Sequence, residues 1–315
     1  MILRLFLAAV VALVAGAGKP QSREPQRMAT RTWTGASQDG NFDTVGNWSA
    51  GVVPVTGDNV VVSGTATYGM TTNLNRITDA ANVGLNIVDF EIQQGFSYDI
   101  GSLASPLRLT ADKFADLGNG NTYFSTDTGS AGLGRATDRV IVDKDDISKF
   151  FYMIGDISGN GSDVTLMEVV RGANTYLGDG TNFVTATTLW IAPRYLHTDV
   201  AVTITLSCFG TTTFMGGGSL TINGASAGVT TLHLGNGEVD FINGAITTLN
   251  QSGGIVQHNC PVADGNISVY NAFGGFFDSR ETLGTKSIGT LNRAPQFTYP
   301  YNPKLTVSTT NYIGG

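Results

Sequence analysis

Residues 156–163 place oxygen-bearing side chains at alternating positions, a spacing typical of the first half of a calcium loop. The candidate ligands are Asp156, Ser158, Asn160 and Asp163. Gly161 occupies the sixth position, as such a loop requires, but Met167 stands at the twelfth, where a bidentate glutamate is needed. Two interpretations remain, a weakly held Ca²⁺ ion and a plain turn built by Asx and Gly residues, and the missing glutamate favours the turn.

Carboxylates that could cleave a polysaccharide are sparse. Hydrolysis of a glycosidic bond needs two carboxyl groups held about 5 to 9.5 Å apart. Asp143, Asp145 and Asp146 do cluster around Lys144. They fall in one short stretch, however, which is typical of a solvated loop or a helix start. The sequence therefore predicts a protein that is not an enzyme.

The histidines and cysteines follow no metal-binding spacing. His197, His233 and His258 lie in separate predicted strands, without the close pairing that a metal site needs, so each is expected to be a ladder or surface residue. Cys208 and Cys260 match no zinc motif and are expected to be small buried apolar residues. Apart from the calcium candidate, no cofactor is expected.

The composition narrows the classes of fold that could position these residues. Glycine supplies 41 of the 315 residues and charged residues only 14%, against about a quarter in an average domain. Low charge excludes a coiled coil and a charge-rich disordered chain, and the irregular glycine spacing excludes collagen. The net charge of −7 makes nucleic acid an unexpected partner. The composition indicates a β-rich, turn-rich protein.

Residues 1–27 differ from the rest of the chain. Arg4 precedes an apolar run from Leu5 to Val14, and small residues follow it, as in a secretory signal peptide. The alternative interpretation is that translation begins at Met28, which leads directly into the first patterned segment, and that residues 1–27 are a mis-assigned leader. The first interpretation predicts export and the second does not.

Short strands recur in the C-terminal third with a period of about 20 residues. The segments 229–233, 246–250, 267–271 and 288–292 align with one another at similar spacing. A glycine begins the second strand of each unit, at Gly218, Gly237, Gly254 and Gly275. Repeats of this length with two or three strands each predict an all-β fold, a right-handed parallel β-helix in which each coil lies on the next.

Stacked coils bring equivalent residues together in ladders about 4.8 Å apart. The predicted inner ladder is Ile246, Ile267 and Ile288, and the predicted amide ladder is Asn250, Asn271 and Asn292. Asparagine suits such a position because stacked amides can hydrogen-bond along the axis. The predicted parts are a signal or leader over 1–27, a cap and first strand over 28–63, irregular coils over 64–185, regular coils over 186–295 and a C-terminal strand or tail over 296–315.

The opening of the folded part carries the pattern W-x-G...D-G-x-F...N-W...V-P...G-D-x-V between residues 33 and 60. It resembles the opening of a group of bacterial and tailed-phage β-helix proteins. Large apolar side chains at this place can close the end of a solenoid, so Trp33, Trp48 and Pro54 are predicted to form the core of a small N-terminal cap. Trp190, in a predicted strand, is expected to be a core residue for the same reason.

The resemblance implies a non-enzymatic virion structural protein, either a head decoration or a tail-associated β-helix. Its partners would be other virion proteins or copies of itself, for example in a homotrimer. The alternative is a secreted bacterial surface adhesin, or a carbohydrate-binding or polysaccharide-degrading β-helix protein that contacts cell-surface glycans. The location would be the virion in the first case and the cell exterior in the second, which requires the signal peptide.

Overall fold

A computed structural model describes most of the chain from Met28 onward. The described residues are 28–75, 85–125, 137–146, 148–154, 162–171, 175–178, 184–191, 203–206, 209–258, 266–280, 285–300 and 302–314. The predicted signal peptide, Cys208, Cys260 and His197 lie outside them. Apart from one 3₁₀ turn, every described element is a β-strand.

The elements in chain order are β1 (Thr30–Trp33), η1 (Val45–Asn47), β2 (Asn59–Val62), β3 (Asn86–Ile92), β4 (Leu107–Arg108), β5 (Thr110–Asp116), β6 (Thr122–Ser125), β7 (Thr137–Asp143), β8 (Phe151–Met153), β9 (Ser162–Arg171), β10 (Thr175–Leu177), β11 (Val184–Ile191), β12 (Thr203–Leu206), β13 (Phe209–Met215), β14 (Ser219–Leu234), β15 (Glu238–Gln251), β16 (Ile255–Gln257), β17 (Asn266–Ala272), β18 (Phe276–Asp278), β19 (Lys286–Arg293) and β20 (Leu305–Tyr312).

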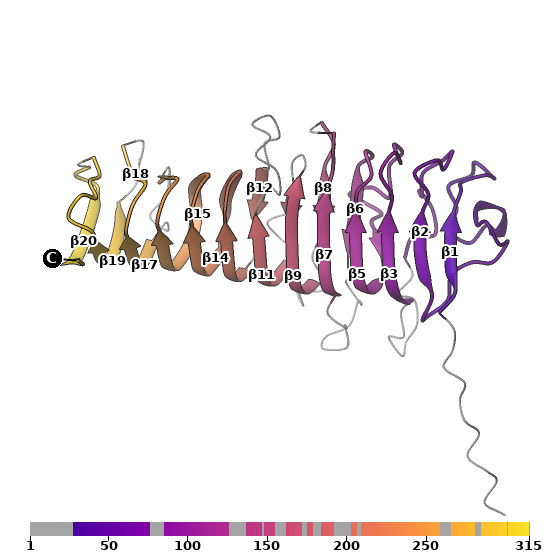
Figure 1. The fold of residues 1–315 in the computed structure, drawn as a ribbon, viewed down its shortest axis with the longest axis horizontal. Helices are drawn as coiled ribbons and strands as arrows, with labels where there is room; N and C mark the ends of the chain where they lie inside the picture. The colour runs from indigo at the N-terminus through magenta and orange to yellow at the C-terminus, as the bar shows by residue number, and fades with distance from the viewer. Residues whose placement is uncertain are drawn as a thin grey trace, which may run out of the picture.

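The strands stack in parallel along the axis of an elongated rod (Figure 1). One column, the long-strand column, runs through β1, β2, β3, β5, β7, β9, β11, β13, the second halves of β14 and β15, and then β17, β19 and β20. The other, the short-strand column, runs through β4, β6, β8, β10, β12, the first halves of β14 and β15, and then β16 and β18. The predicted parallel β-helix is confirmed.

The core fills the space between the two columns. Residues alternate along each strand, so that in β2 Val60 and Val62 are fully buried. Phe114 of the long-strand column stacks on Phe124 of the short-strand column, with ring centroids 4.1 Å apart. Each large apolar side chain buried in this way contributes about 1.5–3 kcal/mol. Because successive rungs repeat the arrangement, one continuous core holds the rod together.

The rungs differ in length along the rod. Trp33 is in register with Val62, whereas Tyr270 is in register with Leu291, so the first rung contains more residues than the later one. The strands set the width of a rung, so the additional N-terminal residues are placed in the corners between strands. The repeat is therefore visible in the sequence only where the corners are short.

The N-terminal end of the rod is covered by the segment that follows β1. Trp33 and Trp48 form an antiparallel bridge, and the Ser49 amide donates a hydrogen bond of 2.9 Å to the Thr32 carbonyl oxygen. At Thr32 and Trp33, the outer edge of β1 is thereby paired instead of being exposed for another strand. We refer to the residues from Trp33 to Asp58, between the end of β1 and the start of β2, as the cap.

Candidate functional site

The aromatic residues of the opening motif form the hydrophobic centre of the cap. The Trp48 ring packs edge-on against Trp33 and Phe42, at centroid distances of 5.2 and 5.0 Å. The indole nitrogen of Trp48 donates to the Phe42 carbonyl oxygen at 2.8 Å, and that of Trp33 donates to the Tyr68 carbonyl oxygen at 2.9 Å. Pro54 is buried as well. All three predicted cap residues are therefore inaccessible to a ligand.

The polar residues of the same motif bind one another. Asn47 is fully buried, and its amide nitrogen donates to Asp39 Oδ1 at 2.6 Å and to the Asn41 carbonyl oxygen at 3.0 Å. The other carboxylate oxygen of Asp39 accepts the Thr44 hydroxyl at 2.6 Å. Hydrogen bonds to the Asp39 carboxylate from the Thr44 hydroxyl, the Asn41 backbone amide and the Asn47 side chain, in that order of effect, lower the pKa of Asp39. The polar residues of the motif thus stabilise the conformation of the cap by hydrogen bonds within it.

The two ladders lie on the long-strand column. Ile246, Ile267 and Ile288 are in register and buried. The amide ladder contains Asn250, Asn271 and Asn292 and continues to Asn311. Each amide nitrogen donates to the side-chain oxygen of the preceding member, at 2.7, 2.7 and 2.8 Å. The sequence repeat missed Asn311, because β20 lacks the glycine corner that marks the earlier units.

The amide ladder continues toward the N-terminus as an aromatic column. Asn250 is in register with His233, which is followed by Phe214 and Trp190. The His233 and Phe214 rings stack at 4.8 Å with an interplanar angle of 9°, and Trp190 meets Phe214 at 5.8 Å and 67°. The prediction that Trp190 is a core residue is wrong. Its side chain is 47% exposed, because Leu189 and Ile191 on either side take the inward positions.

A groove of about 510 Å³ runs beside this aromatic column. Its lining residues are Trp190, Phe214, Met215, Gly216, His233, Leu234, Gly235, Asn250, Ser252 and Phe273. They come from β11, β13, β14 and β15 and from the corners that follow β13, β14, β15 and β17. The groove therefore combines exposed aromatic rings with an amide and a hydroxyl on one wall of the rod.

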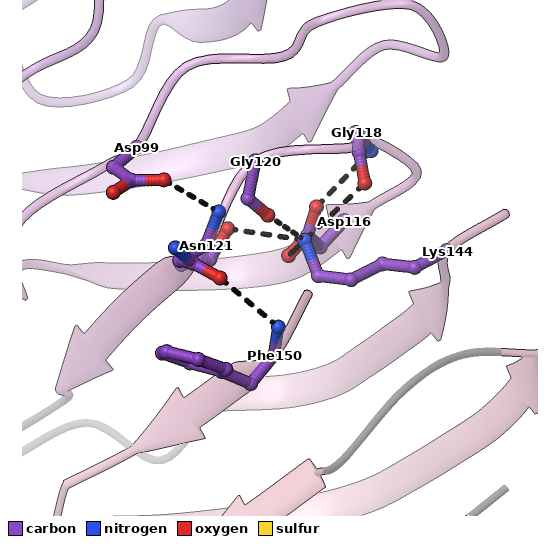
Figure 2. Close-up of polar contacts among 8 residues, drawn as sticks. Asp99, Asp116, Gly118, Gly120, Asn121, Lys144 and Phe150 are labelled. Atoms are coloured by element: carbon purple, nitrogen blue, oxygen red, sulfur yellow. Dashed lines mark hydrogen bonds and ion pairs between the residues drawn. The ribbon is translucent and has the colours of Figure 1, made fainter. Parts of the chain in front are cut away.

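The second unusual polar site is in the interior. Lys144, directly after β7, and Asp116, at the end of β5, are 1% and 0% exposed and form an ion pair of 2.6 Å. The Lys144 ammonium also donates to the carbonyl oxygens of Gly120 and Gly118, at 2.8 and 3.3 Å (Figure 2). The expectation of a solvated loop around Lys144 is therefore wrong for this residue, which is enclosed by the corner of the preceding rung.

Surrounding hydrogen bonds hold the same corner in place. The side-chain oxygen of Asn121 accepts a hydrogen bond from the Phe150 backbone amide at 3.3 Å. The backbone amide of Asn121 donates to the Asp99 carboxylate at 2.9 Å (Figure 2). The ion pair thus links two successive rungs, and Asn121 connects the same corner to Asp99 of the rung before it. Because both charged groups are fully buried, the arrangement is suited to fixing a corner and not to chemistry on a substrate.

The calcium candidate is not assembled by the described parts of the chain. Asp156, Ser158 and Asn160 lie outside them, and Asp163 is placed only through its backbone in β9. Among the residues that the structure describes, no three His, Cys, Asp or Glu side chains are grouped closely enough to hold a metal ion. Within the same residues, no helix is long and apolar enough to cross a membrane.

No protein family, curated protein or solved structure matches the chain.

Proposed function

We propose that the chain is a non-enzymatic structural protein of a virion, a rod displayed as a head decoration or as part of the tail. The observation that carries this proposal is the way side chains link one rung to the next. Such links serve to maintain a long, stiff shape, which is what a projecting component of a particle needs.

The charged side chains support this role as well. Arg31 pairs with Asp58 at 2.9 Å, between β1 and the segment that leads into β2. Arg139 of β7 pairs with Glu168 of β9, the next strand of the long-strand column. Each of these acids is occupied by a cation from a neighbouring rung. Individually such pairs contribute little, about 0–1 kcal/mol at an exposed site, but they repeat along the rod.

The partners in this proposal are other virion proteins or further copies of the chain, including a homotrimer around the long axis. The second candidate function is a secreted surface adhesin, which the exposed aromatic groove favours. Both functions use the same rod and differ in where it is attached, so the mature N-terminus separates them.

The test is mass spectrometry of fractions from a lysed culture of the encoding host. Phage particles are purified on a density gradient, and the N-terminal peptide of the chain is identified. Co-sedimentation with particles and a start at Met28 or Ala29 are expected. Recovery in the cell-envelope or medium fraction, with cleavage near residue 18, would replace the virion proposal by the adhesin. Release of new reducing ends from polysaccharides by the purified chain would refute the non-enzymatic role.

A further inference from the structure

We infer that the groove beside Trp190 binds a neutral oligosaccharide, with its sugar rings against the aromatic column and its hydroxyl groups toward Asn250 and Ser252. The inference extends the proposed function, because a displayed rod presents this wall to solvent. It assigns a ligand class to one defined place on the long-strand column.

The groove exists because side chains are missing at one corner position. Gly216, Gly235, Ser252 and Phe273 each directly follow a strand, and each backbone amide donates to a carbonyl oxygen of the preceding rung, at 2.8–2.9 Å. They therefore form one column along the axis. Gly216 and Gly235 leave space in the groove because they have no side chain, and Ser252 adds a hydroxyl group. Phe273 closes one end of the groove and is 52% exposed.

The backbone does not require a glycine at position 235. A Cβ atom added there would meet no other heavy atom closer than the Met215 carbonyl oxygen at 3.5 Å, an ordinary contact. Gly235 also lies outside the set of glycines with positive φ. Gly237, two residues later, contrasts with it, because its φ is 95° and its added Cβ would lie 2.5 Å from the Gly218 carbonyl oxygen. The backbone conformation and the packing of the rungs would therefore permit a side chain at position 235, and its absence leaves the groove open.

Trp190 differs from other outward-facing aromatic rings of the columns in not being stacked face to face on its aromatic neighbour. On the short-strand column, Tyr152 and Tyr176 stack on each other at 4.9 Å and 16°, so each ring hides a face of the other. In the groove, Phe214 is likewise stacked, on His233 at 4.8 Å and 9°. Trp190 instead meets Phe214 at 67° and is 47% exposed, so its ring is the one that offers a face to a ligand. An aromatic face accepts the flat C–H surface of a pyranose ring, and its exposure in water is costly without such a partner.

The polar groups and the absence of charge define the ligand class. Among the groove's lining residues there is no Asp, Glu, Lys or Arg, so a carboxylated or aminated sugar would find no counter-charge. The net charge of −7 further disfavours the binding of an acidic oligosaccharide. The Asn250 side chain already accepts from Asn271, and the Ser252 hydroxyl donates to the Leu234 carbonyl oxygen at 3.4 Å. An amide group has two donor hydrogens and a hydroxyl oxygen has two lone pairs, so each side chain can form a further hydrogen bond to a sugar hydroxyl. Since rungs repeat about every 4.8 Å, comparable to the length of one sugar ring, an extended oligosaccharide can follow the axis.

The test uses the fluorescence of the chain itself. Of the three tryptophans, Trp33 and Trp48 are buried in the cap and Trp190 is exposed in the groove. The purified chain is applied to a glycan array that holds neutral and acidic oligosaccharides, and the neutral oligosaccharide that binds best is then titrated by tryptophan emission and by calorimetry. Binding is expected to shift the Trp190 emission to shorter wavelength.

Three variants make the test specific. Gly235→Leu fills the groove without backbone strain, Trp190→Ala removes one wall, and both are expected to weaken binding by about tenfold or more. Phe276→Ala removes a similarly exposed ring on β18, outside the groove, and is expected to bind within about twofold of the unchanged chain. The unfolding midpoint of each variant is measured, so that a loss of fold is recognised.

The inference is overturned if no neutral oligosaccharide on the array binds, if acidic ones bind best, or if folded Gly235→Leu and Trp190→Ala variants bind as the unchanged chain does. None of these outcomes would alter the sedimentation of the chain with phage particles. Failure of the ligand inference can therefore be told apart from failure of the virion proposal.

Discussion

Replacement of Lys144 by methionine should destabilise the rungs formed by β5 to β8. The change keeps the approximate length of the side chain but removes the ammonium group. Asp116 would then be left as a buried carboxylate, 0% exposed and without its cation. The Gly118 and Gly120 carbonyl oxygens would lose a donor that lies 3.3 and 2.8 Å away.

The magnitude follows from the geometry of the pair. Breaking a fully buried ion pair by removing one partner costs about 3–5 kcal/mol, because the remaining charge is uncompensated. Asp116→Leu alone should cost a similar amount. The double variant removes both charges and should cost about 1–3 kcal/mol, the penalty for carbonyl oxygens that remain without a donor. The sum of the two single effects should therefore exceed the effect of the double variant by at least about 3 kcal/mol.

Hydrogen exchange followed by mass spectrometry is the suitable assay, because rungs of a solenoid can open separately. Peptides that cover β5 to β8 should exchange faster in the Lys144→Met variant, while peptides that cover β17 and β19 provide an internal reference. Urea unfolding of the four proteins completes the cycle. Additive effects of the two substitutions, or a loss below about 1 kcal/mol for Lys144→Met, would refute the reasoning.

Three further predictions concern the corners, the amide ladder and the cap. Gly254→Ala should lower the free energy of unfolding in urea by about 1–3 kcal/mol, because Gly254 has φ +69° and an added Cβ would lie 2.6 Å from a carbonyl oxygen of the preceding rung. Gly235→Ala is the matched control, and an equal loss there would contradict the explanation. Asn271→Ala removes a hydrogen bond to each neighbour in the ladder and should cost about 1–3 kcal/mol in the same assay, whereas an unchanged midpoint would mean that the ladder does not stabilise the rod. The pKa of Asp39 lies below its ordinary value of 3.8, so its carboxylate stabilises the folded cap above that pH and this contribution is lost as the pH falls through the folded-state pKa. Asp39→Asn should flatten the acid-induced change in tryptophan fluorescence, and an identical acid profile would argue against this linkage.

The regular part of the fold could be predicted because its corners are short. Leu249 pairs with Tyr270 and Tyr270 with Leu291, so equivalent positions recur at a constant interval in the sequence. In the N-terminal half the matched residues, such as Val62 and Ile92, lie further apart along the chain. There the added corner residues hide the period, although each strand still alternates between inward and outward positions.

Lys144 and Trp190 were misplaced for opposite reasons. Residue type suggested a solvated Lys144 and a buried Trp190, and alternation along the strand corrects both. Val140 and Val142 point inward, and the same alternation turns the side chain of Lys144 inward. The acidic residues on either side of Lys144 do not indicate which way its side chain points. Leu189 and Ile191 take the inward positions of β11, which leaves Trp190 outside. Strand periodicity was the stronger signal at each site.

In a solenoid, the outward-facing residues are more informative about function than the inward-facing ones. An inward position must fill a rung of fixed width, and a corner glycine such as Gly237 must permit positive φ, so folding alone explains them. Folding makes no such demand on Gly235, where a side chain would fit, or on Trp190, whose ring adds apolar surface to the exterior. Two departures from what the fold requires, two rungs apart on the same wall, line the same groove: one removes bulk and the other exposes an aromatic ring. Their coincidence is why the groove is a better candidate for a ligand than the cap, whose motif is accounted for by its own internal hydrogen bonds.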